Sequence, residues 1–411
     1  MNGAGATDTH SSDTGDGDPG GDPSEHHDHA HGHAHEHPTR DAQGVRQERQ
    51  PASTEIVEVA PGVLRLQLDI SFPGLGHVNC YAMEDERGVA LVDPGLPGRN
   101  PWRDLQARLK SAGLPLQRVH TVIATHSHPD HYGAAAHLRA ETGAEVVTHE
   151  NFKTFWDPDE EDDEEKYLAG PDDLDGWAAA KERLVRWGRD RFAGGLPDFN
   201  RPTPWGGKHP GPDRRTRVRY RTEGMLLRRY FQPPRPSTRV QDGESIRLGR
   251  TEWLAVHTPG HTVDHLCLLD PANGTLISGD HVLPTITPHI SGLVRADDPL
   301  ALFMASLQKV ADIDGIRCVL PAHGHPFSDL PGRTASIIEH HHERLQKLHA
   351  AAADLGAATV EEFSQRLFVP RSWGPMADSE TFAHLEHLRL AGLATRHKQG
   401  DQLIYEVEPA R

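Results

Sequence analysis

Short apolar runs alternate with amphipathic segments along most of the chain, and this rhythm predicts a layered α/β fold. Alternating apolar and polar residues over 56–68 indicate a half-buried strand, and Glu86-Arg87-Gly88 indicates a hairpin between two apolar runs. Asn273-Gly274 indicates a second hairpin turn. The other elements expected here are strands at 78–83, 89–92, 119–125, 145–148, 253–257, 266–269, 276–278 and 316–320, and helices at 102–112 and 132–142.

Two regions depart from this rhythm. Residues 151–240 are predicted to be a helical and loop insertion that partly covers the functional site described below. They contain an acidic run, interpreted as a solvated face, and an arginine cluster at 214–229. The last part of the chain predicts three helices followed by two strands, at 337–355, 360–367, 379–391 and within 394–407. Such a set resembles a small winged-helix module, which we expect over 333–411.

Composition separates the first 50 residues from the remainder. The chain has 411 residues, with 43 Lys and Arg against 60 Asp and Glu, a formal charge of −17, and 30 His. Residues 1–50 have few large apolar side chains, so we expect a disordered tail. Eight histidines lie in this tail: His10, His26, His27, His29, His31, His33, His35 and His37. Loose metal binding by the tail and a solvated segment without a specific role are both open interpretations.

Charge and cysteine content narrow the classes of function. The acidic balance disfavours bulk affinity for nucleic acid. No apolar run reaches the roughly eighteen residues of a membrane-spanning helix, and the polar start of the chain does not resemble a signal peptide. The three cysteines, Cys80, Cys267 and Cys318, are too few and too widely spaced for a disulfide framework or a Cys-type zinc finger. We therefore expect a reduced, cytoplasmic setting.

The segment with the clearest chemistry follows the strand expected at 119–125. It places His126, His128, Asp130 and His131 within six residues at the carboxyl end of a strand, where α/β folds place their sites. Two His one residue apart in extended chain project to the same side. The turn at Pro129 then lets Asp130 and His131 return toward a second centre. Imidazole and carboxylate ligands suit zinc, with iron or manganese as alternatives.

Three further candidates follow later apolar strands, each in a tight turn that contains glycine. These are His261 after Pro259-Gly260, Asp280 after Ser278-Gly279, and His323 before Gly324. Glycine lets the backbone approach closely in such turns. Burying unpaired His and Asp is costly, so a coincidental core arrangement of these residues is disfavoured.

The order and spacing of these motifs resemble those of the metallo-β-lactamase-fold hydrolases. The motifs are His-x-His-x-Asp-His, then a Pro-Gly-His turn, a Gly-Asp turn and a late His. Asp93, in Leu91-Val92-Asp93-Pro94-Gly95, matches the early structural Asp of that family. The resemblance implies a four-layer αββα sandwich as the catalytic domain over 51–332, interrupted by the insertion at 151–240. Asp at the fifth motif position makes the chain similar to the glyoxalase II branch.

The resemblance also implies a role for each candidate. One metal ion would be held by His126, His128 and His261, and a second by Asp130, His131 and His323, with Asp280 bridging the two. Two such ions, expected to be zinc, generate a hydroxide nucleophile at neutral pH and stabilise a developing oxyanion. Asp130 would also orient the nucleophile and is the predicted catalytic residue.

Other residues are candidates for substrate binding. They are His281 and His289, which follow the bridging Asp, and Arg217 and Arg219, which would bind an anionic group. His265 is interpreted as a packing residue, with contact to a ligand as the alternative. The successive histidines at 340–342 are expected to be exposed on a helix.

Three functions fit these features. The first is hydrolysis of a small ester or thioester, on a small-molecule substrate that would be anionic if the arginine cluster contributes. The second is a phosphodiesterase or endoribonuclease of the same fold, which is disfavoured because Arg389 is the only Arg or Lys between Ser379 and Leu393. The third, a non-catalytic metal-responsive DNA-binding protein, is disfavoured by the complete ligand set. The C-terminal helices are expected to serve packing or dimerisation, which leaves a homodimer open.

Overall fold

The computed structural model describes residues 44–154 except 73, then 203–206, 230, 232 and 234–409. All of these belong to one unit that spans 36–411. Most of the expected tail, the acidic run and the arginine cluster at 214–229 lie outside the described residues, and with them Arg217 and Arg219.

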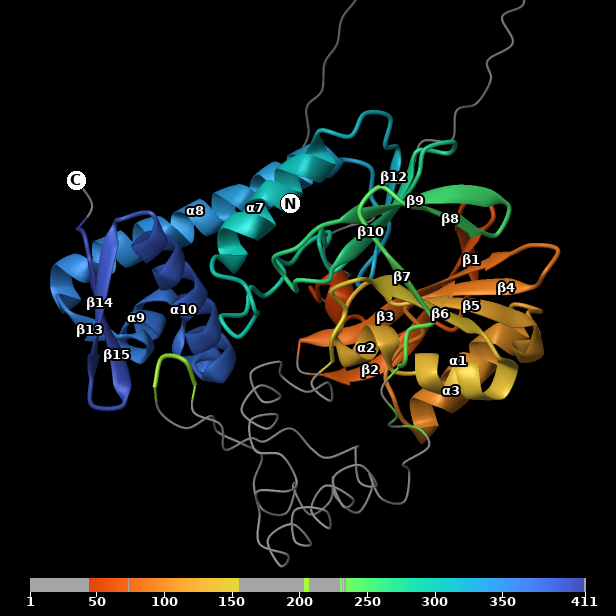
Figure 1. Cartoon of the computed structure of the whole chain (residues 1–411), viewed down its shortest axis with the longest axis horizontal. Helices are drawn as coiled ribbons and strands as arrows, with labels where there is room; N and C mark the ends of the chain where they lie inside the picture. The colour runs from red at the N-terminus through yellow and green to blue at the C-terminus, as the bar shows by residue number, and fades with distance from the viewer. Residues whose placement is uncertain are drawn as a thin grey trace, which may run out of the picture. The chain divides into compact units, whose positions relative to one another are not determined.

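The first sheet has seven strands in the order β1-β2-β3-β4-β5-β6-β7 (Figure 1). Neighbours are antiparallel from β1 to β4 and parallel from β4 to β7. The antiparallel β3–β4 pair confirms the hairpin predicted around Glu86-Arg87-Gly88. The strands are β1 (Val57–Ala60), β2 (Val63–Phe72), β3 (Leu75–Glu84), β4 (Val89–Val92), β5 (Val119–Ile123), β6 (Glu145–His149) and β7 (Thr238–Val240).

The second sheet has five strands in the order β12-β11-β10-β9-β8. Only the β11–β12 pair is parallel within it. The predicted Asn273-Gly274 turn joins the antiparallel strands β10 and β11. The strands are β8 (Ser245–Leu248), β9 (Thr251–His257), β10 (Leu266–Asp270), β11 (Thr275–Gly279) and β12 (Cys318–Pro321).

Apolar side chains from the two sheets share one core, and helices cover their outer faces. Tyr81 and Ile123 of the first sheet pack in the same cluster as Trp253 and Leu268 of the second. Helices α1 (Arg99–Ser111) and α3 (Ala135–Thr142) contribute to a cluster with the first sheet, and α7 (Pro299–Ala311) and α8 (Leu330–Leu355) to one with the second. This order of layers agrees with the sandwich that the sequence predicted (Figure 1).

Helix α7 is an element that the sequence analysis did not predict. Its start has a clear signal, because the Asp298 side chain accepts a hydrogen bond from Ala301 N and Pro299 occupies the first turn. Its buried residues Leu300, Phe303, Leu307 and Val310 recur at helical spacing. The helical periodicity was therefore present in the sequence.

The C-terminal part combines three helices with a small sheet, as predicted. The helices are α8, α9 (Val360–Leu367) and α10 (Pro375–Leu390), and the strands are β13 (Ala358–Thr359), β14 (Ala394–Gln399) and β15 (Gln402–Val407). Strand β15 lies between β13 and β14. The core of this C-terminal part includes Phe363, Leu385 and Tyr405, and also Trp205 from the described part of the insertion. Assignment of these elements as a winged-helix module stays a prediction.

Two findings concern the chain as a whole. Among the described helices, none is long and apolar enough to cross a membrane. Cys80, Cys267 and Cys318 are free thiols, in agreement with the absence of a disulfide framework expected from the sequence.

Candidate metal centre

The seven side chains predicted as ligands meet at one end of the sandwich, and both sheets supply them. His126, His128, Asp130 and His131 follow β5 of the first sheet. The other three, His261, Asp280 and His323, follow β9, β11 and β12 of the second sheet. Their potential ligand atoms form two groups, each with all atoms within 4.8 Å of one another.

The first group consists of His126, His128, His261 and Asp280. His128 Nδ1 lies 2.9 Å from His126 Nε2 and 3.1 Å from His261 Nε2. The Asp280 Oδ2 atom lies 3.6 Å from His261 Nε2 and 3.9 Å from His126 Nε2. Three imidazole nitrogens and one carboxylate oxygen therefore face a common point, which is the number of donors in a tetrahedral zinc site.

The second group consists of Asp130, His131 and His323. Asp130 Oδ2 lies 3.6 Å from Nε2 of both histidines. Asp280 also reaches this group, with Oδ2 at 3.6 Å from His131 Nε2 and Oδ1 at 3.2 Å from His323 Nε2. Asp280 thus contacts both groups, which is the arrangement of a bridging carboxylate.

Several of these buried atoms make no hydrogen bond with the described residues, although they lie within ion-pair distance of one another. His131 Nε2, His323 Nε2 and Asp280 Oδ1 are shielded from solvent and make no hydrogen bond in the described part of the structure. Burying such atoms without a hydrogen bond costs free energy unless another group, such as a metal ion, binds them. Borderline imidazole and hard carboxylate donors directed at a shared space fit a divalent metal ion, and this donor set suits zinc, iron or manganese.

The outer nitrogens of the ring ligands are held by protein groups. His131 Nδ1 lies 2.8 Å from the carboxylate of Asp93, which also accepts hydrogen bonds from Thr125 N and Thr125 Oγ1. A ligating imidazole commonly donates its second N–H to such an acceptor, which fixes the ring and its tautomer. Asp93 therefore takes the supporting role expected from its position after β4.

Backbone carbonyls hold two further ligands in the same way. His261 Nδ1 donates to His289 O at 2.7 Å, and His323 Nδ1 donates to His77 O at 2.7 Å. Because a carbonyl can only accept, Nδ1 carries the proton in both rings and Nε2 presents a lone pair. The sequence analysis did not identify His77. Its contact with His323 joins residues 246 positions apart and passes through a carbonyl that every residue has.

His265 and Gly260 fix the backbone at two of the candidate ligands that follow strands of the second sheet. His265 accepts a hydrogen bond from Asp280 N at its Nε2 and donates from Nδ1 to Thr258 Oγ1. The preference for simple packing was therefore wrong, because His265 fixes the backbone of the bridging Asp. Gly260, with φ of 137°, precedes His261; a Cβ there would lie 2.4 Å from Phe303, so the turn requires glycine.

The charges of the two groups differ. Burial, together with neighbouring imidazoles, lowers the pKa of His126 well below its ordinary value and that of His128 to about 3. Burial also opposes protonation of His131, but Asp130, Asp93 and Asp280 outweigh it and raise the pKa of His131 well above its ordinary value. The carboxylates of the second group thus favour positive charge between them, which a metal ion would provide.

The residues predicted to bind substrate differ in where the structure places them. His281 is completely buried and packs against the Phe303 ring, with centroids 5.2 Å apart, so the prediction that it lines a pocket was wrong. His289 has 23% of its side chain exposed and contacts the Glu380 carboxylate. It stays a candidate, as do Arg217 and Arg219 outside the described residues.

A third group of ligand-type side chains lies between α8 and α10. It consists of His341, Glu380 and His384, all buried. His341 Nδ1 lies 3.1 Å from His384 Nε2, but Glu380 already contacts Arg344 and His289. We interpret this group as an ion-pair cluster, since Arg344 and His289 already occupy its only carboxylate. The expected exposure of 340–342 was wrong for His341, because α10 covers that face of α8.

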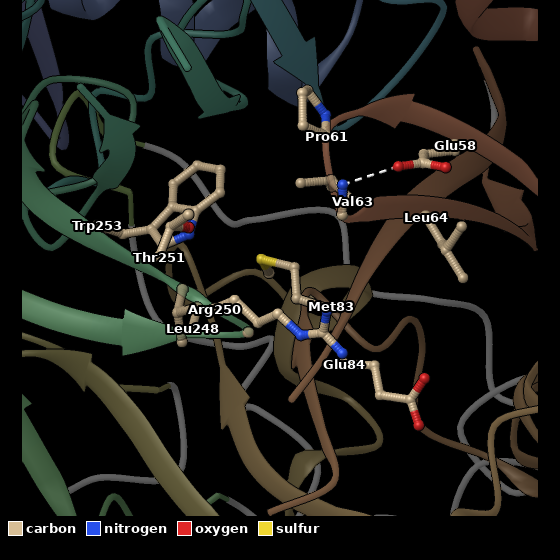
Figure 2. Close-up of a pocket in the computed structure, with 12 residues that line it drawn as sticks. Glu58, Pro61, Val63, Leu64, Met83, Glu84, Leu248, Arg250, Thr251 and Trp253 are labelled. Carbon is tan, nitrogen blue, oxygen red and sulfur yellow. Dashed lines mark hydrogen bonds between the residues drawn. The ribbon is translucent and has the colours of Figure 1, made fainter. Parts of the chain in front are cut away.

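A separate hollow lies away from the metal ligands (Figure 2). Glu58, Val63, Met83, Arg250 and Trp253 are among its lining residues, from β1 to β3 and the β8–β9 hairpin. None of the seven candidate ligands lines it. It is therefore not the site predicted from the sequence.

Comparison with known proteins agrees with this geometry. The family model described as "Metallo-beta-lactamase superfamily" matches residues 73–323. The Bacillus subtilis protein named "Probable metallo-hydrolase YqjP" is 23% identical over 343 residues, which cover 81% of this chain and 94% of that protein. The lactamase-like protein adaB of Aspergillus niger is 34% identical over 155 residues, or 36% of this chain and 44% of that protein.

Two crystal structures are similar over most of the chain. A metallo-beta-lactamase family protein from Thermus thermophilus is 29% identical with a TM-score of 0.62, and covers 85% of this chain and 100% of its own. A beta-lactamase domain protein from Burkholderia ambifaria is 25% identical with a TM-score of 0.62, and the corresponding shares are 87% and 96%. With a family model that matches more than half of its residues, the chain belongs to the metallo-beta-lactamase superfamily.

Proposed function

We propose that this chain is a hydrolase that binds two divalent metal ions, zinc first, and cleaves a small ester or thioester. The observation that carries the proposal is the set of seven donors in two adjoining groups, including buried atoms that make no hydrogen bond with any described residue. Two adjacent ions supply a water nucleophile activated at neutral pH and stabilise negative charge that develops on the substrate.

Each residue would have a separate task. His126, His128 and His261 would hold one ion, Asp130, His131 and His323 the other, and Asp280 both. Asp130 has 19% of its side chain exposed, more than His131, His323 or Asp280, so its carboxylate is the donor of the second group most open to an incoming molecule. It would accept a hydrogen bond from the attacking water and so fix the direction of attack.

The finer choice of substrate rests on chemistry. A thiolate leaves without needing a proton, so a thioester can be cleaved by an activated water and a charged site alone. The Asp at the fifth position of His-x-His-x-Asp-His supports a glyoxalase II-like activity, and the metallo-hydrolase named among the relatives supports hydrolysis in general. We also propose that 51–332 form the catalytic domain and 333–411 a winged-helix-like module.

Zinc-loaded full-length protein should be screened against acyl-CoA and glutathione thioesters, lactones, phosphodiesters and short RNA. We expect turnover of thioesters or esters, and its loss in Asp130→Ala. Asp69→Ala, which removes an exposed carboxylate on β2, is the matched control and should keep full activity. Turnover confined to phosphodiesters or RNA would favour the nuclease alternative, and a wild-type chain that binds no zinc would overturn the proposal.

A further inference from the structure

A chain of contacts leads from helix α10 to the candidate ligand His261. The carbonyl of His289 accepts the Nδ1 proton of His261 at 2.7 Å, and the ring of His289 lies with Nδ1 at 3.2 Å from Glu380 Oε2. Glu380 belongs to α10 and is also ion-paired with Arg344 of α8. The loop residue His289 is therefore held on its ring side by the C-terminal helices and holds a ligand on its backbone side.

The direction of each hydrogen bond can be assigned from chemistry. Although burial opposes ionisation of Glu380, His289 and Arg344 lower its pKa to about 2, so at neutral pH the carboxylate can only accept. His289 Nδ1 must then donate to Glu380, which fixes the orientation of that ring. The same reasoning makes His261 Nδ1 the donor to His289 O, and leaves His261 Nε2 facing His128 and Asp280.

The loop beyond His289 is also fixed to α10 through its backbone. Gly292 N donates to Ser379 O at 3.1 Å and to Ser379 Oγ at 3.0 Å, and Ser291 Oγ lies 3.1 Å from Ser379 Oγ. A Cβ at Gly292 would lie 2.5 Å from Phe382 Cδ1 and 2.7 Å from Ser379 O. Loop and helix are in such close contact that a shift of α10 would displace His289.

We propose that Glu380 is a positioning residue for the metal centre, because it fixes His289 and thereby the carbonyl that orients His261. The inference rests on the proposed function in one respect, namely that His261 binds a metal ion. The C-terminal helices then belong to the active site. They are more than a dimerisation or nucleic-acid-binding appendage.

The matched control lies on the same helix. Glu386 is also a buried carboxylate ion-paired with arginine, through Arg389 and Arg396, and it also accepts a hydrogen bond from Tyr405. It has no hydrogen bond or ion pair with 284–292 among the described residues. Glu386→Ala therefore removes a similar stabilising interaction from α10 without disturbing the loop that holds His261.

The test is the zinc affinity of the metal-stripped full-length chain, measured by competition with a chromophoric chelator. We expect Glu380→Ala to weaken the binding of one of the two ions about tenfold. This is the lower end of the loss of affinity that follows when a metal ligand loses its hydrogen-bond partner. Glu380→Gln should restore most of the affinity, since the amide oxygen still accepts from His289. Glu386→Ala should lower the unfolding temperature and leave both zinc affinities unchanged.

Three further measurements keep the inference testable if Glu380→Ala folds poorly. Gly292→Ala should cause a similar loss of affinity, because it forces the loop away from α10 without altering a charge. In a His261→Ala background, Gly292→Ala should cause no additional loss of zinc affinity. Hydrogen exchange at the Gly292 amide of the metal-free protein should accelerate in Glu380→Ala and stay near the wild-type rate in Glu380→Gln and Glu386→Ala.

The outcomes separate the two proposals. If wild type binds two ions tightly and folded Glu380→Ala and Gly292→Ala bind them equally well, the positioning role of Glu380 is overturned and the hydrolase proposal stands. A wild-type chain without tight zinc overturns the hydrolase proposal itself. Equal losses of affinity in the Glu380 and Glu386 variants would show that α10 acts only through general stability.

Discussion

The Asp93 carboxylate lies 2.8 Å from Nδ1 of His131, and it is held there by a strained backbone. Among the described residues, Asp93 is the only non-glycine residue with a positive φ, at 55°. Thr125 fixes both of its carboxylate oxygens, at 2.8 Å each. Such strain persists where the surrounding contacts over-determine the conformation, and here it aims one carboxylate at one candidate ligand.

Replacing Asp93 by Ala should weaken the binding of the ion that Asp130, His131 and His323 would hold. The variant loses the acceptor of His131 Nδ1 and keeps a backbone conformation that costs an alanine about 1 kcal/mol. We expect a loss of zinc affinity of about 10- to 100-fold for that ion, measured by chelator competition. Asp93→Asn tolerates the left-handed backbone and still accepts, so its loss should be smaller; equal losses in both variants would contradict this account.

The number of bound ions should follow the two ligand groups. Dialysed His261→Ala and His323→Ala should each contain about one zinc ion fewer than wild type, and Asp280→Ala should lose both, since its carboxylate contacts both groups. Metal analysis of the full-length proteins measures this. His342→Ala, which removes an exposed histidine from α8, is the control, and any zinc on the tail histidines contributes equally to all variants.

The same metal analysis of His341→Phe tests the third group of ligand-type side chains. A third ion in wild type that is lost in His341→Phe, with the other two retained, would show that the group between α8 and α10 binds a metal. Our interpretation of that group as an ion-pair cluster would then be wrong.

Removing the metal should destabilise the fold. An ion that binds only the folded state adds about 2.7 kcal/mol to the free energy of unfolding when free metal is 100 times its Kd. We expect EDTA to lower the unfolding temperature of the zinc-loaded protein by at least a few degrees. Asp280→Ala should start from a lower temperature and show almost no response to EDTA. An equal response in both proteins would place the stabilising ion elsewhere.

Asp264 should make the stability depend on pH. Burial raises the pKa of this carboxyl from 3.8 to about 6 and outweighs its hydrogen bonds, one of which Ser127 Oγ donates at 3.0 Å. Below about pH 4 both the folded and unfolded states are protonated. As pH rises toward 6 the unfolded state loses its proton more readily, so the free energy of unfolding falls, by on the order of 3 kcal/mol above pH 6.

Asp264→Asn removes this titration and keeps an acceptor for Ser127. The variant should be more stable than wild type at pH 7.5 and about equally stable at pH 4, measured by denaturant unfolding of the metal-stripped proteins. A variant that is less stable than wild type at pH 7.5 would show that the ionised carboxylate has a partner that offsets its burial.

The candidate ligands could be predicted because each has a local signal. His126, His128, Asp130 and His131 are close in sequence after an apolar strand, and His261, Asp280 and His323 each occupy a glycine-containing turn after another strand. The sheets then bring these turns to one end of the sandwich. Local sequence and the topology of the sheets were sufficient for this part of the site.

The supporting residues could not be predicted in this way. His77 and His289 act on ligands through their carbonyls, which carry no sequence information. Glu380 contacts His289 from 91 positions away, and nothing in the local pattern of α10 distinguishes it from Glu386. His281 was misassigned because proximity to Asp280 in sequence says little about which face of the turn is buried. Helix α7, in contrast, had a detectable cap and periodicity.

The division of the ligands between the two sheets has a consequence for how the protein is made. During synthesis the first sheet supplies His126, His128, Asp130 and His131, but neither proposed ion would have its full set of ligands at that stage. The first set closes only with Asp280 after β11, and the second only with His323 after β12. Tight metal uptake would therefore occur late, after both sheets have emerged from the ribosome and packed, and a truncated chain would not sequester zinc at this centre.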